Sequence, residues 1–209
     1  MRYAELTIKD FVHELAQGTP TPGGGSVAAL SGVLASALSS MVSGLTLGRP
    51  KHEDVWPEME EVREQAEQQT LELQELIDRD AEAYNRVMAA FKMPREDQVQ
   101  KEQRRQAIQE ATLEAAQVPL QTLKAVASLA DLLRTSADKG NPNCITDVGV
   151  GSQLMLAAAK GAAFNVRINL SGLKDEGLVQ DLKKEVQDLL QQVEAAAGDL
   201  EAKVESALE

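Results

Sequence analysis

Asp80 is the residue of this sequence best placed for acid–base chemistry. It continues an apolar stripe with Leu73 and Leu76 and precedes Tyr84 by one helical turn, so it is expected to point inward. Desolvation raises the pKa of a buried carboxyl and a neighbouring cation lowers it, and either shift is typical of acid–base groups. The alternative is a structural Asp bonded to Tyr84 or to a basic side chain. The spacing does not separate these two interpretations.

A glycine-rich segment, Gly23-Gly24-Gly25-Ser26, leads into an uncharged helix predicted over 27–47. Free backbone N–H groups and the helix dipole attract an anion at such a place. No Lys follows the last glycine and no strand precedes the segment, so it is neither a nucleotide loop nor a dinucleotide fingerprint. Two interpretations remain: a flexible turn that lets two helices pack, or a backbone site for a carboxylate or the edge of a heterocycle.

Further polar residues border or interrupt a largely apolar helix predicted over 145–170. Asp147 follows the turn that contains Asn141, and a first-turn acid there either stabilises the helix dipole or is a second catalytic candidate. Asn165 and Asn169 stand one turn apart among apolar residues, where amides need partners or a ligand. Asp147 and Asn165 are about 27 Å apart along the helix. Within one subunit they cannot touch one small reacting group, although a long ligand or a subunit boundary could use both.

Metal and covalent chemistry find little support in the sequence. His13 and His52 are far apart, Cys144 is the single cysteine, and neither a His-x-x-x-His nor a Gly-x-Ser-x-Gly pattern occurs. We therefore expect no metal site and no tightly bound cofactor.

The composition sets the class of protein that must position these residues. The 209 residues carry a net charge of −12 and a pI near 4.7, so nucleic acid and membrane surfaces are poor partners. Aromatic residues make up only 3%, and a sequence rich in Ala, Leu, Glu and Gln favours helix. We expect an all-α protein with one domain over 1–209. The lone Cys144 and an N-terminus without a secretory-signal pattern predict a cytoplasmic location.

Apolar periodicity predicts a bundle of long helices after a short N-terminal helix, which Thr7 and Asp10 cap. The long helices are expected over 27–47, 55–91, 95–135 with a kink or break at Pro119, 145–170, and from 175 onward, with 19–26 non-helical.

Two of these helices, 27–47 and 145–170, are nearly uncharged, which indicates that they are buried. A membrane span is the alternative interpretation of the helix over 27–47, although its serines lower the hydrophobicity. Small residues recur at every fourth position of that helix: Ala28, Gly32, Ser36, Ser40 and Gly44. We expect a homodimer or higher oligomer that associates through this small-residue face or through the 145–170 helix.

Four segments in order resemble the cyclodeaminase/cyclohydrolase family, which includes the C-terminal domain of formiminotransferase-cyclodeaminase and free-standing methenyltetrahydrofolate cyclohydrolases. The segments are Pro22-Gly23-Gly24-Gly25-Ser26, Asp80-Ala81-Glu82-Ala83-Tyr84, Gly140-Asn141-Pro142-Asn143 with Asp147, and residues 161–169 around Asn165 and Asn169. The resemblance implies an all-helical dimer with a folate groove near the subunit boundary. It implies a reaction at the N5/N10 bridge of tetrahydrofolate, either cyclohydrolase or cyclodeaminase, by acid–base catalysis without a metal.

On this resemblance a tetrahydrofolate derivative is the substrate, Asp80 is the acid–base group and Tyr84 orients it, with Asp147 as the second catalytic candidate. The residues expected to bind substrate are Gly23, Gly24, Gly25, Ser26, Asn141, Asn165 and Asn169, together with Arg49, Lys51 and Lys139 for the anionic glutamate tail. The alternative is a non-catalytic helical scaffold or a folate-binding protein.

Overall fold

A computed structural model describes residues 2–209, and in that range the chain is built from helices without a strand. The α-helices are α1 (Ile8–Leu15), α2 (Gly24–Thr46), α3 (Trp56–Phe91), α4 (Gln98–Lys139), α5 (Ile145–Leu170) and α6 (Glu176–Leu208). Short 3-10 helices cover Tyr3–Glu5, Pro50–Val55 and Pro142–Cys144. The all-α prediction is confirmed.

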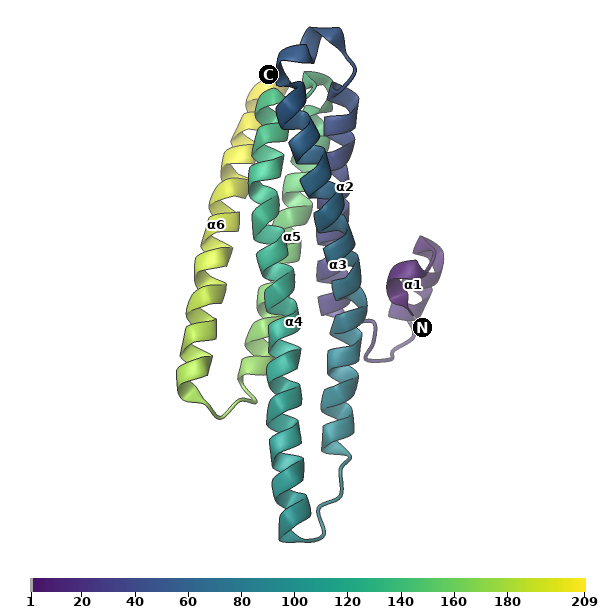
Figure 1. Ribbon diagram of the computed structural model, residues 1–209, viewed down its shortest axis with the longest axis vertical. Coiled ribbons are helices and arrows are strands. Elements are labelled where there is room, and N and C mark those ends of the chain that lie inside the picture. Colours follow the sequence, from purple (N-terminus) through teal and green to yellow (C-terminus); the bar gives the residue numbers. More distant parts are fainter. Residues whose placement is uncertain (1) are drawn as a thin grey trace.

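Helices α2 to α5 form a four-helix bundle in which α2 packs on α3 and α5, and α4 packs on α3 and α5. In Figure 1, α3 and α4 lie in front of α2 and α5, α6 lies along one edge against α4 and α5, and α1 stands beside the bundle. The α3–α4 hairpin extends below the other helices. The α3 residues beyond the start of α2 therefore lie on a projecting part of the molecule.

Short polar side chains begin several of these helices. The Thr7 hydroxyl accepts a hydrogen bond from the Asp10 N–H at 3.1 Å, as its spacing predicted, and Asp97 and Asp175 cap α4 and α6 in the same way. Gly23 precedes α2 and has no side chain to donate or accept. The first turn of α2 therefore depends on another part of the chain for a hydrogen-bond acceptor.

One predicted boundary is wrong, and of the kink or break predicted at Pro119 the break does not occur. Residues 24–26 are the first helical turn of α2 instead of a loop, and an acceptor from α3, described below, bonds the otherwise unpaired N–H of Ser26 in this turn. Helix α4 also continues through Pro119 to Lys139 without a break. Pro119 has no N–H to donate to the Ala115 carbonyl, and the Asn169 side chain donates to that oxygen at 2.8 Å instead. A hydrogen bond from α5 thus compensates for the proline in α4.

The prediction that the small-residue face of α2 forms a subunit interface is wrong for its first half. Ala28, Gly32 and Ser36 are buried inside the subunit. A Cβ on Gly32 would lie 3.0 Å from Val126 and 3.2 Å from Leu73, so this face lets α2 approach α3 and α4 closely. Helix–helix packing inside one subunit produces the same four-residue spacing as packing between subunits.

By length and composition α2 is the one helix among residues 2–209 that could span a membrane, with a mean hydropathy of 1.6. In the bundle, 56% of that apolar window is buried. Its serines bond to neighbouring helices: Ser36 donates to the Ala66 carbonyl at 2.6 Å, Ser43 donates to the Met59 carbonyl, and Ser39 shares a hydrogen bond with Ser136. These are the contacts of a core helix, and they explain why α2 carries no charge.

Candidate functional site

Asp80 of α3 lies directly against the first turn of α2. The Ser26 hydroxyl is 3.0 Å from Asp80 Oδ2 and 3.1 Å from the Ile77 carbonyl, and the Ser26 backbone N–H also bonds the carboxyl. A Cβ on Gly25 would overlap the Asp80 carboxyl, at 2.5 Å from its Cγ. Glycine is thus required at position 25 because the carboxyl group occupies the space of a side chain.

The environment of Asp80 raises its pKa above the usual range of an aspartate. Burial is the largest cause, and the hydrogen bonds from the Ser26 side chain and backbone oppose it in part. Within residues 2–209 no Lys, Arg or His nitrogen lies within 4.0 Å of this carboxyl. Asp80 is still only half-buried. The group is therefore a carboxyl of raised proton affinity that a bound molecule can reach.

Tyr84 follows Asp80 on the same face of α3, one turn further from α2. Its side chain is 37% exposed, and in the described part of the chain no hydrogen bond joins its hydroxyl to Asp80. The structural alternative for Asp80, a bond to Tyr84 or to a basic side chain, does not describe this structure. Tyr84 is instead an exposed aromatic ring beside the carboxyl.

Asn165 of α5 reaches the same end of α2. A Cβ on Gly24 would lie 3.7 Å from Asn165 Nδ2, which donates to the Gly161 carbonyl at 2.9 Å. The Asn165 Oδ1 has no partner among the described residues, and Asn165 as a whole is half-buried. Asn169 differs, because its amide bonds the Ala115 carbonyl beside Pro119 and also the Asn165 carbonyl, at 2.8 Å each. In both asparagines the side-chain oxygen is left without a partner among the described residues, but Asn165 is the one that lies against the first turn of α2.

Other predicted site residues lie at the opposite end of α2: Arg49, Lys51, Lys139, Asn141 and Asp147. The 23 residues of α2, from Gly24 to Thr46, separate the two ends by about 33 Å. Asn141 is buried and packs against the end of α2. Its backbone N–H donates to Thr46 Oγ1 at 2.8 Å, and its side-chain Oδ1 accepts a hydrogen bond from the Asn143 N–H. One subunit thus brings Gly23, Gly24, Gly25, Ser26, Asp80, Tyr84 and Asn165 together, and keeps the second group apart.

The second group contains two lysines that share a cavity of about 460 Å³. Lys51 and Lys139 line it together with Lys203, while Lys139 pairs with Glu58 at 2.7 Å and Lys203 pairs with Asp138. These ion pairs already reduce the positive charge that an anionic ligand would meet.

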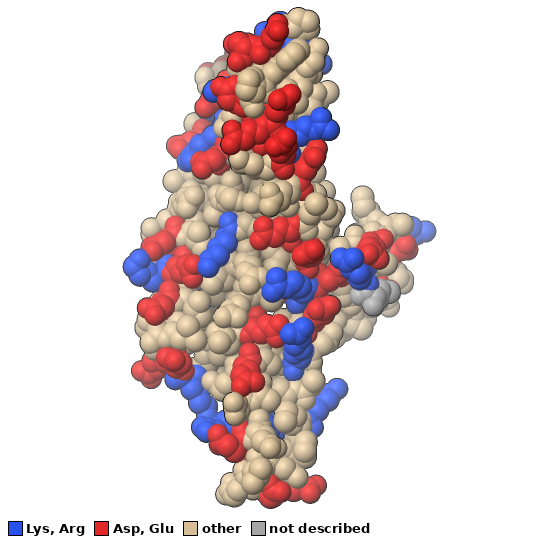
Figure 2. All heavy atoms as spheres, in the orientation of Figure 1, with Lys and Arg blue, Asp and Glu red and all other residues tan. Residues whose placement is uncertain are grey.

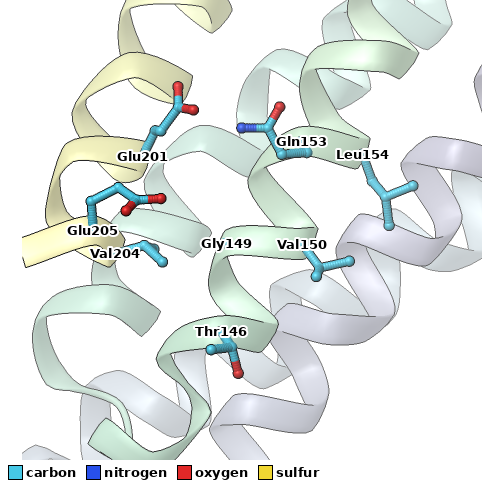
Figure 3. A pocket seen from close by; sticks show the side chains of 8 residues that line it. All are labelled: Thr146, Gly149, Val150, Gln153, Leu154, Glu201, Val204 and Glu205. Atoms are coloured by element: carbon cyan, nitrogen blue, oxygen red, sulfur yellow. The ribbon is translucent and has the colours of Figure 1, made fainter. Parts of the chain in front are cut away.

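A larger cavity, of about 610 Å³, lies between α5 and α6. Figure 3 shows Glu201 and Glu205 reaching toward it from α6, while Val150 and Leu154 on α5 point toward α2. Its lining is Thr146, Gly149, Val150, Gln153, Leu154, Glu201, Val204 and Glu205. Since it contains two carboxylates and no cation, it is unsuited to an anionic ligand and is not our candidate site.

Helix α3 also carries a buried acid, Asp78, which was not predicted from the sequence. Asp78 is 8% exposed, accepts a hydrogen bond from the Tyr3 backbone N–H and lies 3.4 Å from Arg2 Nε. It attaches the N-terminal segment to the bundle. No local spacing could reveal it, because its partners lie 75 residues earlier in the chain.

In residues 2–209 no three His, Cys, Asp or Glu side chains gather as metal ligands.

Comparison with known proteins identifies the class to which this arrangement belongs. Residues 7–188 match the model of the formiminotransferase-cyclodeaminase family, so this chain belongs to that family, whose members named below are enzymes. The sequence-based resemblance is confirmed.

Individual relatives cover almost the whole chain. It is 38% identical to the methenyltetrahydrofolate cyclohydrolase of Methylorubrum extorquens, over 95% of this chain and 93% of that protein. It is 32% identical to the rat formimidoyltransferase-cyclodeaminase, over 96% of this chain but 38% of the larger protein. The crystal structure of formiminotetrahydrofolate cyclodeaminase from Thermotoga maritima superposes with a TM-score of 0.89, at 32% identity and 98% coverage of both chains. The chain is thus an enzyme of folate one-carbon chemistry.

Proposed function

We propose that this chain is a methenyltetrahydrofolate cyclohydrolase in which Asp80 transfers protons at the N5/N10 bridge. The observation that carries the proposal is the Asp80 carboxyl. Burial raises its pKa, and no cation in residues 2–209 lies within 4.0 Å to neutralise it. A group with a pKa closer to neutrality is a better acid–base catalyst than an ordinary aspartate. The 38% identity to a cyclohydrolase over nearly the full length of both proteins supports this choice of reaction.

The reaction starts from a cation whose methenyl carbon bridges N5 and N10. Water attacks that carbon, and ionised Asp80 takes the proton that the water loses. The bond from the carbon to N5 then breaks, N5 takes the proton from Asp80, and the remaining hydroxyl releases its proton to solvent as the formyl group forms on N10. A negative carboxylate beside the bridge also stabilises the cationic substrate.

Substrate binding at this place would use the end of α2 and its neighbour on α5. The Gly24 and Gly25 N–H groups, which have no partner among the described residues, and the unused Oδ1 of Asn165 supply donors and an acceptor for the polar edge of a pterin. The methenyl carbon is already electrophilic, so the proposed reaction requires neither a metal nor a tightly bound cofactor. A tetrahydrofolate derivative enters as substrate.

A second candidate is the formiminotetrahydrofolate cyclodeaminase reaction, which the Thermotoga maritima structure favours by its name and its TM-score of 0.89. There N10 attacks the formimino carbon on N5, and ammonia leaves after protonation to give the same methenyl cation. Protonated Asp80 would donate the proton to the leaving nitrogen. A carboxyl with a raised pKa fits this role as well, because it retains its proton at a higher pH.

One spectroscopic experiment separates these possibilities. The purified protein is incubated with methenyltetrahydrofolate, and separately with formiminotetrahydrofolate, while the methenyl absorption is followed. Catalysed loss of the absorption identifies a cyclohydrolase, and a gain from the formimino substrate identifies a cyclodeaminase. No change with either substrate would leave the scaffold or folate-binding alternative and would refute an enzymatic role for Asp80.

The proposed enzyme is a homodimer that associates through α2 and α5. Helix α2 contains no charged residue, yet Leu34, Met41 and Leu45 are 40–46% exposed on its outer face. On α5, Val150 and Phe164 are 55% and 63% exposed at helical spacing. By contrast, charges of both signs cover the α3–α4 face in Figure 2. Two chains of charge −12 can approach best through an uncharged surface.

Replacing Met41 with Glu is expected to convert the dimer to a folded monomer. The new charge would lie in an apolar interface without a partner, whereas in the monomer position 41 is 40% exposed and tolerates it. Light scattering at micromolar concentration and circular dichroism measure mass and folding on the same sample. Leu71→Glu is the control, because Leu71 is 65% exposed on the opposite face of α3 from Asp80. A monomeric wild-type protein would refute the dimer.

The dimer also bears on the second group of predicted residues. Arg49, Lys51, Lys139 and Asp147 can act at Asp80 only from the partner subunit, since about 33 Å separates them within one chain.

The buried free thiol of Cys144 fits the cytoplasm, which we propose as the location.

A further inference from the structure

A strip of α3 side chains leads away from Asp80, and it bears on how the proposed substrate is held. Tyr84, Val87 and Phe91 follow Asp80 at intervals of four, three and four residues, so all four lie on one face of the helix. Tyr84 is 37% exposed, Val87 is half-buried and Phe91 is 50% exposed. Because Asp80 lies against the first turn of α2, the strip continues past the start of that helix, along the α3–α4 hairpin that extends below α2 in Figure 1.

At the far end of this strip α4 contributes a fixed positive charge. The Arg104 guanidinium carbon lies 5.7 Å from the centroid of the Phe91 ring. Its Nε and Nη2 donate to the Phe91 carbonyl at 3.3 and 3.0 Å. Across residues 2–209 no carboxylate lies within 4.0 Å of this guanidinium. Arg104 is half-buried and held in place, and among the described residues its Nη1 hydrogens have no acceptor.

The spacing between this charge and Asp80 matches the dimensions of a folate. Phe91 follows Asp80 by eleven positions on α3, a rise of about 16 Å along the helix. In a folate, about ten bonds through the aminobenzoyl ring and the glutamate separate N10 from the terminal carboxylate, on the order of 12 Å in extended form. The side chains at both ends shorten the remaining gap. The order of groups also agrees. Along the folate, the polar pterin head is followed by the aminobenzoyl ring and then by the glutamate carboxylate. Along the protein, the Asp80 carboxyl is followed by apolar side chains and then by Arg104.

We propose that Arg104 binds the glutamate carboxylate of the substrate, with the aminobenzoyl ring lying along Tyr84, Val87 and Phe91. This rests on the proposed function, because it places the reacting bridge at Asp80. An arginine can bind a carboxylate through two N–H groups, and a held guanidinium loses little freedom on binding. Arg49, Lys51 and Lys139 are about 33 Å from Asp80 within the subunit, so Arg104 supplies a tail site that needs no partner.

The test compares a substrate that has the glutamate with one that lacks it. Wild-type protein and Arg104→Gln are assayed with methenyltetrahydrofolate and with methenyltetrahydropteroate. The substitution is expected to raise KM for the glutamate-bearing substrate about tenfold or more without changing kcat, since it removes a charge-assisted contact that does not take part in the reaction. For the pteroate the two proteins should have the same KM. Arg104→Lys should fall between them.

The control is Arg105→Gln, because Arg105 is the next residue of α4 and pairs with Glu102 rather than with Phe91. It should leave both KM values unchanged. An unchanged KM in Arg104→Gln, or an equal rise for both substrates, would overturn the proposal. If Arg104→Gln does not fold, equal KM values of the wild-type protein for the two substrates would overturn it as well.

The test also distinguishes a failure of this inference from a failure of the proposed function. Equilibrium binding of tetrahydrofolate and tetrahydropteroate to the same proteins needs no turnover. If the wild-type protein converts neither methenyl compound, the cyclohydrolase proposal fails. The tail site still stands if tetrahydrofolate binds about tenfold more tightly than tetrahydropteroate and Arg104→Gln removes the difference, and it fails if no difference exists.

Discussion

Replacing Asp80 with Asn is expected to lower turnover of methenyltetrahydrofolate by about 10²–10⁴-fold, the usual contribution of a general acid–base group. Asparagine keeps the size of the side chain and an acceptor for the Ser26 hydroxyl but cannot carry a proton between water and N5. The measurement is kcat for the two proteins from the decay of the methenyl absorption. Wild-type turnover in Asp80→Asn would refute the catalytic assignment and move the role to Asp147, reaching the substrate from the partner subunit.

The same variant should remain folded, with a free energy of unfolding within about 1 kcal/mol of the wild type at neutral pH. The larger loss of about 3–5 kcal/mol that follows breaking a buried ion pair is not expected, because no cation is paired with this carboxyl. Since the fold raises the pKa of Asp80, its protonated form contributes stability at low pH. That contribution is lost as the pH rises through the raised pKa. Denaturation midpoints over this range measure it, and Asp80→Asn should remove the dependence.

Gly25→Ala should have the second largest effect. The added Cβ would overlap the Asp80 carboxyl and displace it from Ser26, so we expect about 10²-fold lower turnover, the low end of the acid–base contribution. Overpacking should also cost about 1–3 kcal/mol of stability. The measurements are kcat and the denaturation midpoint of one preparation.

Gly24→Ala is the matched control for this substitution. Its Cβ would lie 3.7 Å from Asn165 Nδ2, which is an ordinary van der Waals contact, and it changes the same helical turn. We expect its turnover to stay close to that of the wild type. If both variants lost turnover equally, the defect would come from the glycine-rich turn as a whole and not from the Asp80 carboxyl.

The helical fold could be predicted because long helices leave a strong periodic signal. The ranges 55–91 and 145–170 agree with α3 and α5 to within one residue. The errors come from contacts between distant segments. Asp80 accepts a hydrogen bond from the Ser26 N–H in the first turn of α2, and Asn169 compensates for Pro119 within α4. Neither contact can be detected from the local sequence of the element that it stabilises.

The candidate site was predictable in part for the same reason. The inward position of Asp80 follows from its spacing with Leu73 and Leu76. Its closeness to Gly25 and Ser26 depends on how α2 packs on α3, which only the resemblance to a family implied. Arg104 was missed because its role depends on the Phe91 ring, which lies on the other helix of the α3–α4 hairpin.

The central claim is that Asp80, with the pKa that its buried position raises, is the group that catalysis titrates. Carbon-13 NMR of the aspartate carboxyls, compared with Asp80→Asn to assign the signal, measures this pKa directly. The measured pKa is compared with the midpoint of the acidic limb in the pH profile of kcat/KM for methenyltetrahydrofolate, because kcat/KM should fall as the proposed base loses its negative charge. We predict a titration above the ordinary aspartate range whose midpoint coincides with that limb. An ordinary or lowered pKa, or a limb that lies elsewhere, would contradict the account.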